Sequence, residues 1–180
     1  WQLSDLTDQL FFNFRDINPC DYGEDTISLH ADNDYWACML IKGTKDDDNT
    51  CTEPEKLNDP SCNEPDGDLF DGELGGLLNF IWWVDDGDNV FEVGEKVLDE
   101  GVAKRYFTGK LLTLADSSQN PFEKEGGPLI GSGTYYIGKA WCFGSLGKLP
   151  LPPGGYPDGP AGDNNEVGGA GTPEDGGVSC

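Results

Sequence analysis

The sequence predicts an all-β domain, because three aromatic-rich apolar runs have the pattern of inner strands, at residues 35–41, 79–84 and 134–147. In the last run one parity carries large side chains and the other small ones: Tyr135, Ile137, Trp141 and Phe143 against Gly138, Ala140, Cys142 and Gly144. Such alternation is typical of a strand whose large side chains pack on one side. Lys139 interrupts the large face, and its stem is expected to lie along apolar surface with the ammonium in water.

The other elements are less regular, and turn-forming Gly, Pro, Asn and Asp separate them. They are expected in this order: a helical turn or edge segment at 1–10, the start of a strand at 11–14, a turn at 15–25, a strand at 26–31, a polar insertion at 42–72, a short helix at 73–78, a turn at 85–89, a strand at 90–93, a turn at 96–100, and strands or short helices at 104–108 and 110–114.

The composition changes after residue 147, and this divides the chain into two expected parts. Residues 1–148 are predicted to form the β domain, and residues 149–180, dense in Pro, Gly, Asp and Asn, an extended arm or loop without a core. The acidic run at residues 46–48 is interpreted as a solvated charge run.

Length and charge exclude several classes of function. The 180 residues suffice for one well-buried core and at most two. A net charge of −23 repels nucleic acid and anionic lipid, and fits solubility in salt, cation binding or a surface exposed to the medium. No apolar run reaches membrane-spanning length. The chain starts at Trp1 without a signal peptide and is expected to be a mature or clipped segment.

Six cysteines in an acidic, loop-rich chain indicate an oxidising compartment, and secretion is inferred from them. Cys51 and Cys62 flank a polar loop, and a bridge between them would contribute about 3 kcal/mol. Cys38 and Cys142 lie on two predicted core strands and could pair across the sheets, which leaves Cys20 with Cys180 by elimination. Zinc is the rival interpretation, but no C-x-x-C motif occurs.

The strongest candidate for a metal site is the acidic turn after the second aromatic run. Asp85, Asp86, Asp88 and Glu92 offer the carboxylate oxygens that Ca²⁺ prefers, although their spacing does not match an EF-hand. The favoured alternative is a solvated Asp-Gly turn without a metal. No cofactor is expected to be required, and Ca²⁺ is the one ion considered for this chain.

The motifs of common enzymes are missing, so the chain is predicted not to be an enzyme. His30 is the single histidine and is interpreted as a surface or satisfied side chain, and Ser132 lies in a Gly-rich turn. Multi-His metal sites are therefore excluded, and a Ser-His-Asp hydrolase is not expected. Carboxylates are so abundant that no acid and base pair stands out.

Several longer motifs resemble those of a known family. They lie in residues 6–14, 18–30, 36–39, 51–55, 80–88 and 135–144 and include NPCDYGEDTISLH, FIWWVDDGD and YYIGKAWCFG. Together they resemble the secreted TasA/camelysin proteins, whose signal peptides are of the type cut by the SipW peptidase. The resemblance implies a jelly-roll β-sandwich with long disulfide-pinned loops, which polymerises outside the cell into biofilm-matrix filaments or archaeal bundling pili. In such fibres an N-terminal strand of one subunit completes the sheet of the next.

The chain departs from this family at three places. The family's extra N-terminal strand and its strands after the final Cys are not part of this sequence, and Cys20 replaces a common Gly, which implies an additional or intermolecular bridge. The metallopeptidase activity described for camelysin is not carried over, because no H-E-x-x-H motif is present.

The expected function is therefore a structural subunit of an extracellular filament, at the cell surface or in a biofilm matrix. Its partner would be another copy of the chain, joined head to tail by strand exchange, so that the contact propagates as an open fibre. The alternatives are a monomeric secreted module that binds carbohydrate or Ca²⁺, and a secreted hydrolase.

Overall fold

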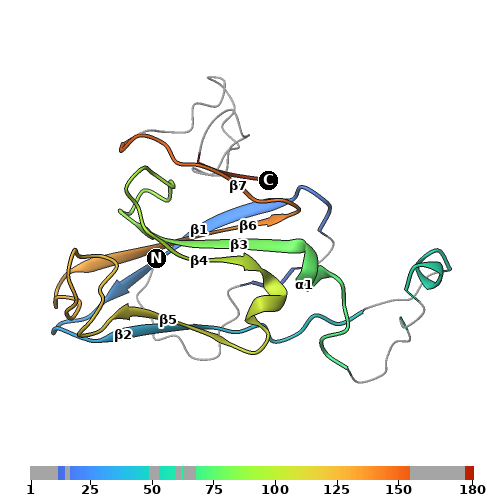
Figure 1. Ribbon diagram of the computed structural model, residues 1–180, viewed down its shortest axis with the longest axis horizontal. Coiled ribbons are helices and arrows are strands. Elements are labelled where there is room, and N and C mark those ends of the chain that lie inside the picture. Colours follow the sequence, from blue (N-terminus) through green and yellow to red (C-terminus); the bar gives the residue numbers. More distant parts are fainter. Residues whose placement is uncertain (1–11, 15–16, 49–52, 60–61, 63–67, 155–176) are drawn as a thin grey trace.

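The computed structural model describes residues 12–14, 17–48, 53–59, 62, 68–154 and 177–180, which form a mostly β structure of antiparallel sheets with few helices. A four-stranded sheet has the order β1-β6-β3-β4, and two smaller sheets pair β2 with β5 and β7 with β8 (Figure 1). The strands are β1 Tyr22–His30, β2 Ala37–Ile41, β3 Leu78–Asp85, β4 Val97–Val102, β5 Lys110–Ala115, β6 Thr134–Phe143, β7 Gly147–Leu149 and β8 Gly177–Ser179. The helices are short: η1 Glu55–Leu57, α1 Leu74–Leu77 and η2 Ala103–Tyr106.

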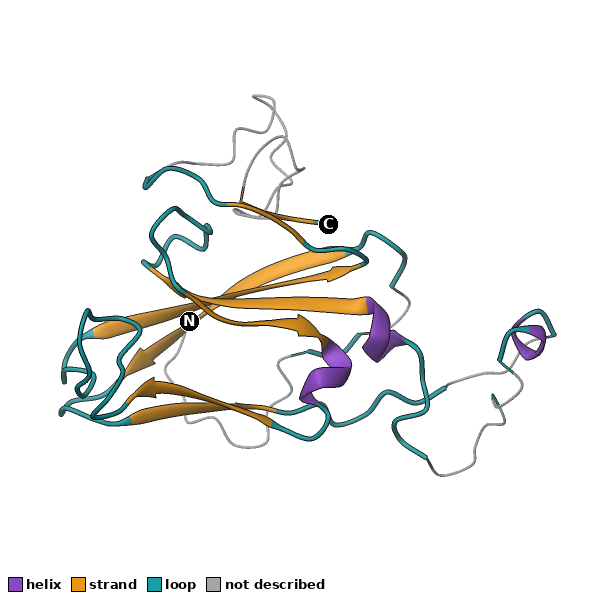
Figure 2. Cartoon of the chain, viewed as in Figure 1, coloured by secondary structure: helices purple, strands orange, loops and turns teal. Residues whose placement is uncertain are grey.

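The main core lies between the four-stranded sheet and the β2–β5 sheet (Figure 2). Its buried residues come from β3, η2, β5 and β6: Leu78, Phe80, Trp82, Tyr106, Leu114 and Ile137. The predicted parity of β6 is confirmed, since Ile137, Trp141 and Phe143 all face this core. Large apolar side chains at alternating positions of the paired strands β3 and β6 therefore face this core.

A second cluster covers the opposite face of the four-stranded sheet. It joins the small-residue face of β6 to β3, to the β3–β4 connection and to β8: Ile81, Trp83, Phe91, Ala140 and Val178. In Figure 1 the two-stranded β7–β8 sheet lies above the four-stranded sheet and the β2–β5 sheet lies below it. The four-stranded sheet is thus covered on both faces, which explains the nearly continuous burial along β3.

The ammonium of Lys139 is not in water, contrary to the prediction. The side chain is only 2% exposed, and its Nζ lies 3.1 Å from Asp25 Oδ2 and 4.4 Å from the centre of the Phe12 ring. A buried ammonium requires such compensation, because loss of hydration otherwise opposes burial. Phe12 and Phe14, predicted to begin a strand, form no strand and instead pack their rings against β3 and β6.

The chain between β3 and β5 also differs from the prediction. Residues 90–93 form no strand, and the strand lies at Val97–Val102, where a turn was expected. Val90 and Phe91 are buried because this segment folds back over the outer face of the sheet. Residues 110–114, predicted as a strand or a short helix, lie in the strand β5, and the short helix predicted at 73–78 is confirmed as α1. The strand β1 begins four residues earlier than the predicted strand.

The end of the chain contributes to the core, which the arm prediction did not include. Val178 of β8 is 2% exposed and belongs to the outer cluster. The division of the chain at residue 148 stays a prediction. None of the helices in the described ranges is long and apolar enough to cross a membrane.

Candidate functional site

Three of the four predicted metal ligands come together at the end of β3. Asp85 is the last residue of that strand, and Asp86 and Asp88 follow it in the connection to β4. One carboxylate oxygen from each of the three lies within 4.8 Å of the other two. Asp85 is buried, whereas Asp86 and Asp88 are exposed, so the group opens to water on one side.

Glu92, the fourth predicted ligand, does not join this group. Its buried side chain accepts a hydrogen bond from the backbone N–H of Gly154 at 2.5 Å, and its backbone bridges to Leu151. Glu92 therefore fastens the segment after β7 to the β3–β4 connection. Glu92 is not among the carboxylates that converge at the end of β3, and its role as a metal ligand stays a prediction.

Glu95 organises the acidic connection in a way the sequence pattern did not reveal. Its Oε1 accepts the N–H of Asp86 at 3.1 Å, and its Oε2 accepts the N–H of Glu92 at 2.8 Å. Burial, opposed by these hydrogen bonds, raises the pKa of Glu95 to about 8, with the charges of Asp85 and Asp86 adding to the rise. The two oxygens of Glu95 thus link the backbone of Asp86 to that of Glu92 within the β3–β4 connection.

Asp85 is tied to the edge strand β1 through its neighbours. The Thr26 hydroxyl lies 3.2 Å from Asp85 Oδ2 and 2.5 Å from Asn89 Oδ1, and the N–H of Asn89 donates to Asp85 Oδ2 at 3.4 Å. Burial raises the pKa of Asp85, these two hydrogen bonds lower it, and the charges of Asp88 and Asp86 raise it further. Asp85 Oδ1 has no hydrogen-bond partner among the described residues.

Glu24 is a further acidic residue that the sequence did not single out. It lies two residues before Thr26, on the same face of β1, and both of its carboxylate oxygens are buried without a partner in the described part of the chain. Burial and the charge of Asp85 raise its pKa to about 9. Glu24 was missed because residues 15–25 were predicted to be a turn, which placed no side chain on a sheet face.

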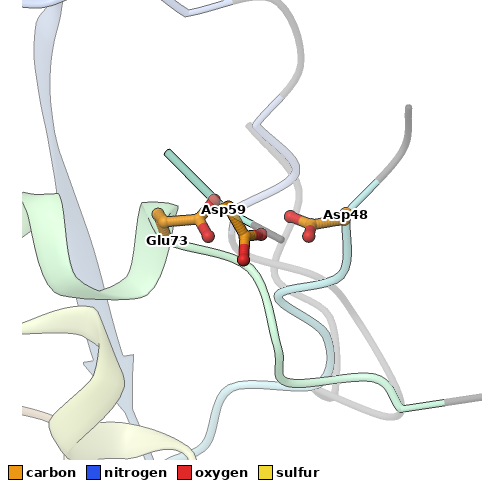
Figure 3. A group of neighbouring side chains, drawn as sticks. All are labelled: Asp48, Asp59 and Glu73. Atoms are coloured by element: carbon orange, nitrogen blue, oxygen red, sulfur yellow. The ribbon is translucent and has the colours of Figure 1, made fainter. Parts of the chain in front are cut away.

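A second carboxylate group lies near the start of α1. Asp48, Asp59 and Glu73 each place one oxygen within 4.8 Å of the others, and Figure 3 shows them converging from separate stretches of chain. Glu73 is exposed and the other two are half-buried. The neighbouring Asp46 is not part of a solvated run, because its carboxylate accepts the N–H of Gly75 at 2.8 Å.

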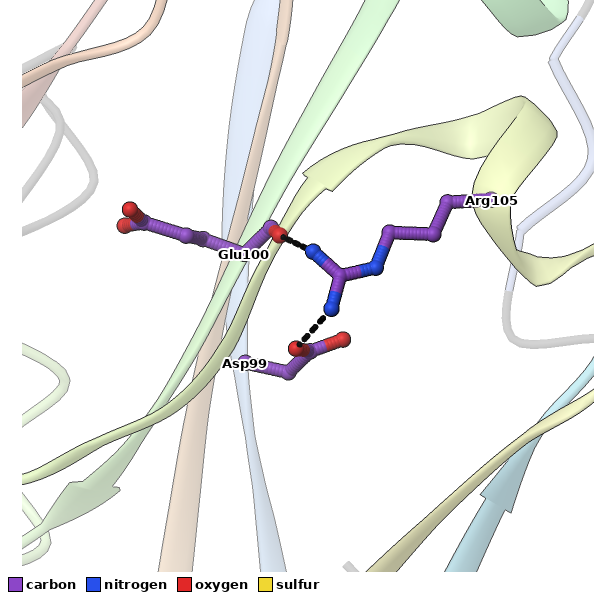
Figure 4. Close-up of polar contacts among 3 residues, drawn as sticks. All are labelled: Asp99, Glu100 and Arg105. Atoms are coloured by element: carbon purple, nitrogen blue, oxygen red, sulfur yellow. Dashed lines mark hydrogen bonds and ion pairs between the residues drawn. The ribbon is translucent and has the colours of Figure 1, made fainter.

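A groove of about 260 Å³ lies between two edge strands of different sheets. Residues 96–99 of the β4 edge and 110–113 of β5 line it, together with Gln119 and Pro121. Arg105 closes the corner where β4 ends, since its Nη2 donates to Asp99 Oδ1 at 2.9 Å and its Nη1 to the Glu100 carbonyl at 2.6 Å (Figure 4). The lysines Lys96 and Lys110 line the groove and Arg105 lies near it, so cationic side chains gather here on an otherwise acidic chain.

The cysteine pairing differs from the predicted one. Cys142 forms a disulfide with Cys180, whereas Cys20 and Cys38 are free and exposed. Cys142 belongs to the small-residue face of β6, which faces β7–β8, and Cys38 lies on β2 in the other sheet. Cys62 is buried and disulfide-bonded, but Cys51 lies outside the described residues.

The two residues considered for catalysis, His30 and Ser132, lie at a strand end and in a turn. His30 is exposed at the end of β1, with its Nδ1 at 3.4 Å from Thr134 Oγ1. Ser132 lies in a turn with a φ of 64°. The absence of enzymatic activity remains a prediction.

Comparison of the chain with protein-family models, curated proteins and solved structures found no match.

Proposed function

We propose that this chain is a structural subunit of an extracellular filament, at the cell surface or in a biofilm matrix, in which neighbouring copies exchange strands. The observation that carries the proposal is the groove between the edge strands β4 and β5. Among the described strands, β4 pairs only with β3 and β5 only with β2. Each therefore presents one row of backbone N–H and C=O groups without a strand partner, which is the template for strand addition.

Charge supports a second copy of this chain as the donor. Lys96 and Lys110 line the groove, and the one acidic residue among the described lining, Asp99, is paired with Arg105. The whole chain has 34 acidic residues against 11 basic ones, so most of its segments are acidic. An extended acidic segment from a neighbouring copy would be attracted to this groove, and complementary charge mainly raises the rate and specificity of association.

The outer face of the β2–β5 sheet offers apolar surface for contact between subunits. Leu40 and Leu111 are register partners on this sheet and are 63% and 61% exposed. Trp36, directly before β2, is 61% exposed. Large apolar side chains grouped on one exposed face are typical of interaction surfaces.

The resemblance to the TasA/camelysin family supports the same function, and it implies that the two facing sheets are a jelly-roll sandwich. The Cys142–Cys180 disulfide agrees with an oxidising compartment, as a secreted protein requires.

Negative-stain electron microscopy of the purified chain tests the proposal. We expect fibres from the unmodified protein and dispersed particles from the K96E/K110E variant, because the reversed charges repel an acidic donor. The matched control is K42E/K56E, which changes charge equally at two exposed lysines outside the groove and should still form fibres. Circular dichroism would check that all three proteins are folded.

Two results would contradict strand exchange at this groove: dispersed particles from the unmodified protein, or fibres from K96E/K110E as abundant as those from the control. The acidic group at the end of β3 favours a second candidate, a monomeric secreted module that binds Ca²⁺. Dispersed particles that still bind the ion would support that candidate.

A further inference from the structure

We propose that Asp85, Asp86 and Asp88 bind one Ca²⁺ ion at the end of β3. The site lies on the face of the four-stranded sheet opposite the β2–β5 layer, so it does not depend on the filament proposal. Asp85 belongs to β3, Asp86 and Asp88 belong to the β3–β4 connection, and Thr26 of β1 contacts Asp85.

The first argument is the closeness of like charges. Three carboxylate oxygens lie within 4.8 Å of one another, and Asp85 is 4% exposed. Ionised carboxylates at this separation repel each other, and the repulsion is strongest where burial lowers the local dielectric constant. A divalent cation at their centre turns this repulsion into attraction.

The second argument is independent and concerns an oxygen without a donor. Asp85 Oδ1 is buried, and no described group donates a hydrogen bond to it. An ionised carboxylate only accepts, so a buried oxygen of this kind needs a donor or a cation. The nearest polar groups do not meet this need, because Thr26 and Asn89 hydrogen-bond to the other oxygen, Asp85 Oδ2.

The chemistry of the donors identifies the class of ion. The group contains only oxygen ligands, with no His or Cys among them, and such sites suit hard cations. The ligands belong to an irregular turn, in which Gly87 and Asn89 have φ values of 112° and 63°. Ca²⁺ accepts irregular geometry and mixed carboxylate and carbonyl oxygens, whereas Mg²⁺ demands a near-ideal octahedron.

The position of the site indicates what binding would do. Asp85 ends β3, and Thr26, which contacts it, belongs to β1, with β6 between the two strands. The ring of Tyr136 on β6 packs against Gly87, within 2.9 Å of the place where a Cβ would be. An ion held here would therefore fasten the β3–β4 connection to the edge strand β1 across β6.

Terbium luminescence and calorimetry test the site on the whole chain. Tb³⁺ replaces Ca²⁺ at oxygen sites, and the nearby Tyr136 ring can transfer excitation to it. We expect saturable luminescence with one Tb³⁺ per chain at physiological salt, displaced by Ca²⁺, and an affinity for Mg²⁺ at least about tenfold weaker than for Ca²⁺. Physiological salt suppresses diffuse counterion binding to a chain of net charge −23.

The variant D86N/D88N should abolish the saturable signal and remain folded, because both side chains are exposed and Asn preserves their shape. The matched control D48N/E73Q removes two charges from the other carboxylate group and should bind normally. Absence of saturable binding, unchanged binding by D86N/D88N, or loss of binding in the control would overturn the proposal. All of these readouts are independent of fibre formation.

Discussion

The indole ring of Trp83 occupies the space where residue 138 would carry a side chain. A Cβ placed on Gly138 would lie 2.1 Å from Trp83 Cε2 and 2.3 Å from Cζ2. The two residues are register partners on β3 and β6, and Trp83 is completely buried. A glycine on β6 therefore allows the Trp83 ring of β3 to lie across the neighbouring strand in the outer cluster.

Substitution G138A should destabilise the fold strongly. The added methyl group meets a buried ring that has no open space to move into, and overpacking of this kind lowers the free energy of unfolding by about 3 kcal/mol. The control G76A adds the same methyl group where no atom lies within 4 Å, and should change stability by less than about 1 kcal/mol. Urea denaturation of the three proteins measures both effects, and equal midpoints for G138A and G76A would contradict the packing argument.

Removal of the Cys142–Cys180 disulfide should lower the stability of the folded chain. The bridge links residues separated by 38 positions, and the chain-entropy model predicts a contribution of about 4 kcal/mol for a loop of that size. We expect C180S to lose most of it, while C38S, at an exposed free cysteine, should stay within about 0.5 kcal/mol of the unmodified protein. Guanidinium unfolding without reductant compares them. A C180S protein as stable as C38S would show that the bridge does not hold β8.

The stability of D46N relative to the unmodified protein should increase with pH. Burial raises the pKa of Asp46 above 3.8, although the Gly75 N–H and Lys104 act against this rise. A raised pKa in the folded state means that the group's contribution is complete below the unfolded value and is lost as pH rises through the folded value. The unmodified protein should therefore lose stability relative to D46N as the pH rises above about 3.8.

Asp116 provides a control for this pH dependence with the opposite sign. The Ser118 hydroxyl and the N–H groups of Ser118 and Gln119 donate to its carboxylate, and these hydrogen bonds lower its pKa. Its contribution is present above the unfolded value and is lost as pH falls through the folded one. Urea midpoints at several pH values should therefore diverge in opposite directions for D46N and D116N, and parallel trends would contradict both assignments.

The pair formed by Lys139 and Asp25 should respond unequally to substitution. K139M keeps the apolar stem beside Phe12 and removes a charge from the core, so stability should stay within about 1 kcal/mol of the unmodified protein or rise. D25N removes a carboxylate partner from a buried ammonium and should cost about 1–2 kcal/mol, even though Asp25 is largely exposed. Thermal and urea unfolding of both variants test this order. Greater loss in K139M than in D25N would show that the charge itself stabilises the core.

Local pattern in the sequence was sufficient for much of the fold. The alternation around Ile137 and Trp141 predicted both the strand β6 and the face that enters the main core. The same reasoning failed for β4, because the run at residues 90–93 looks more like a strand than residues 97–102 do. Phe91 is buried against the outer face of the four-stranded sheet, and this contact decided that its segment folds over the sheet and forms no strand. A local pattern contains no information about that contact.

The acidic group shows the same division between local and long-range information. The sequence by itself determined that Asp85, Asp86 and Asp88 lie close together, because neighbours in a turn remain neighbours in any fold. Only the tertiary structure decided that Thr26 contacts Asp85, that Glu92 accepts a hydrogen bond from Gly154 and that Cys142 pairs with Cys180. The physical reason is that strand order and register set such contacts, and both result from packing of the whole sheet.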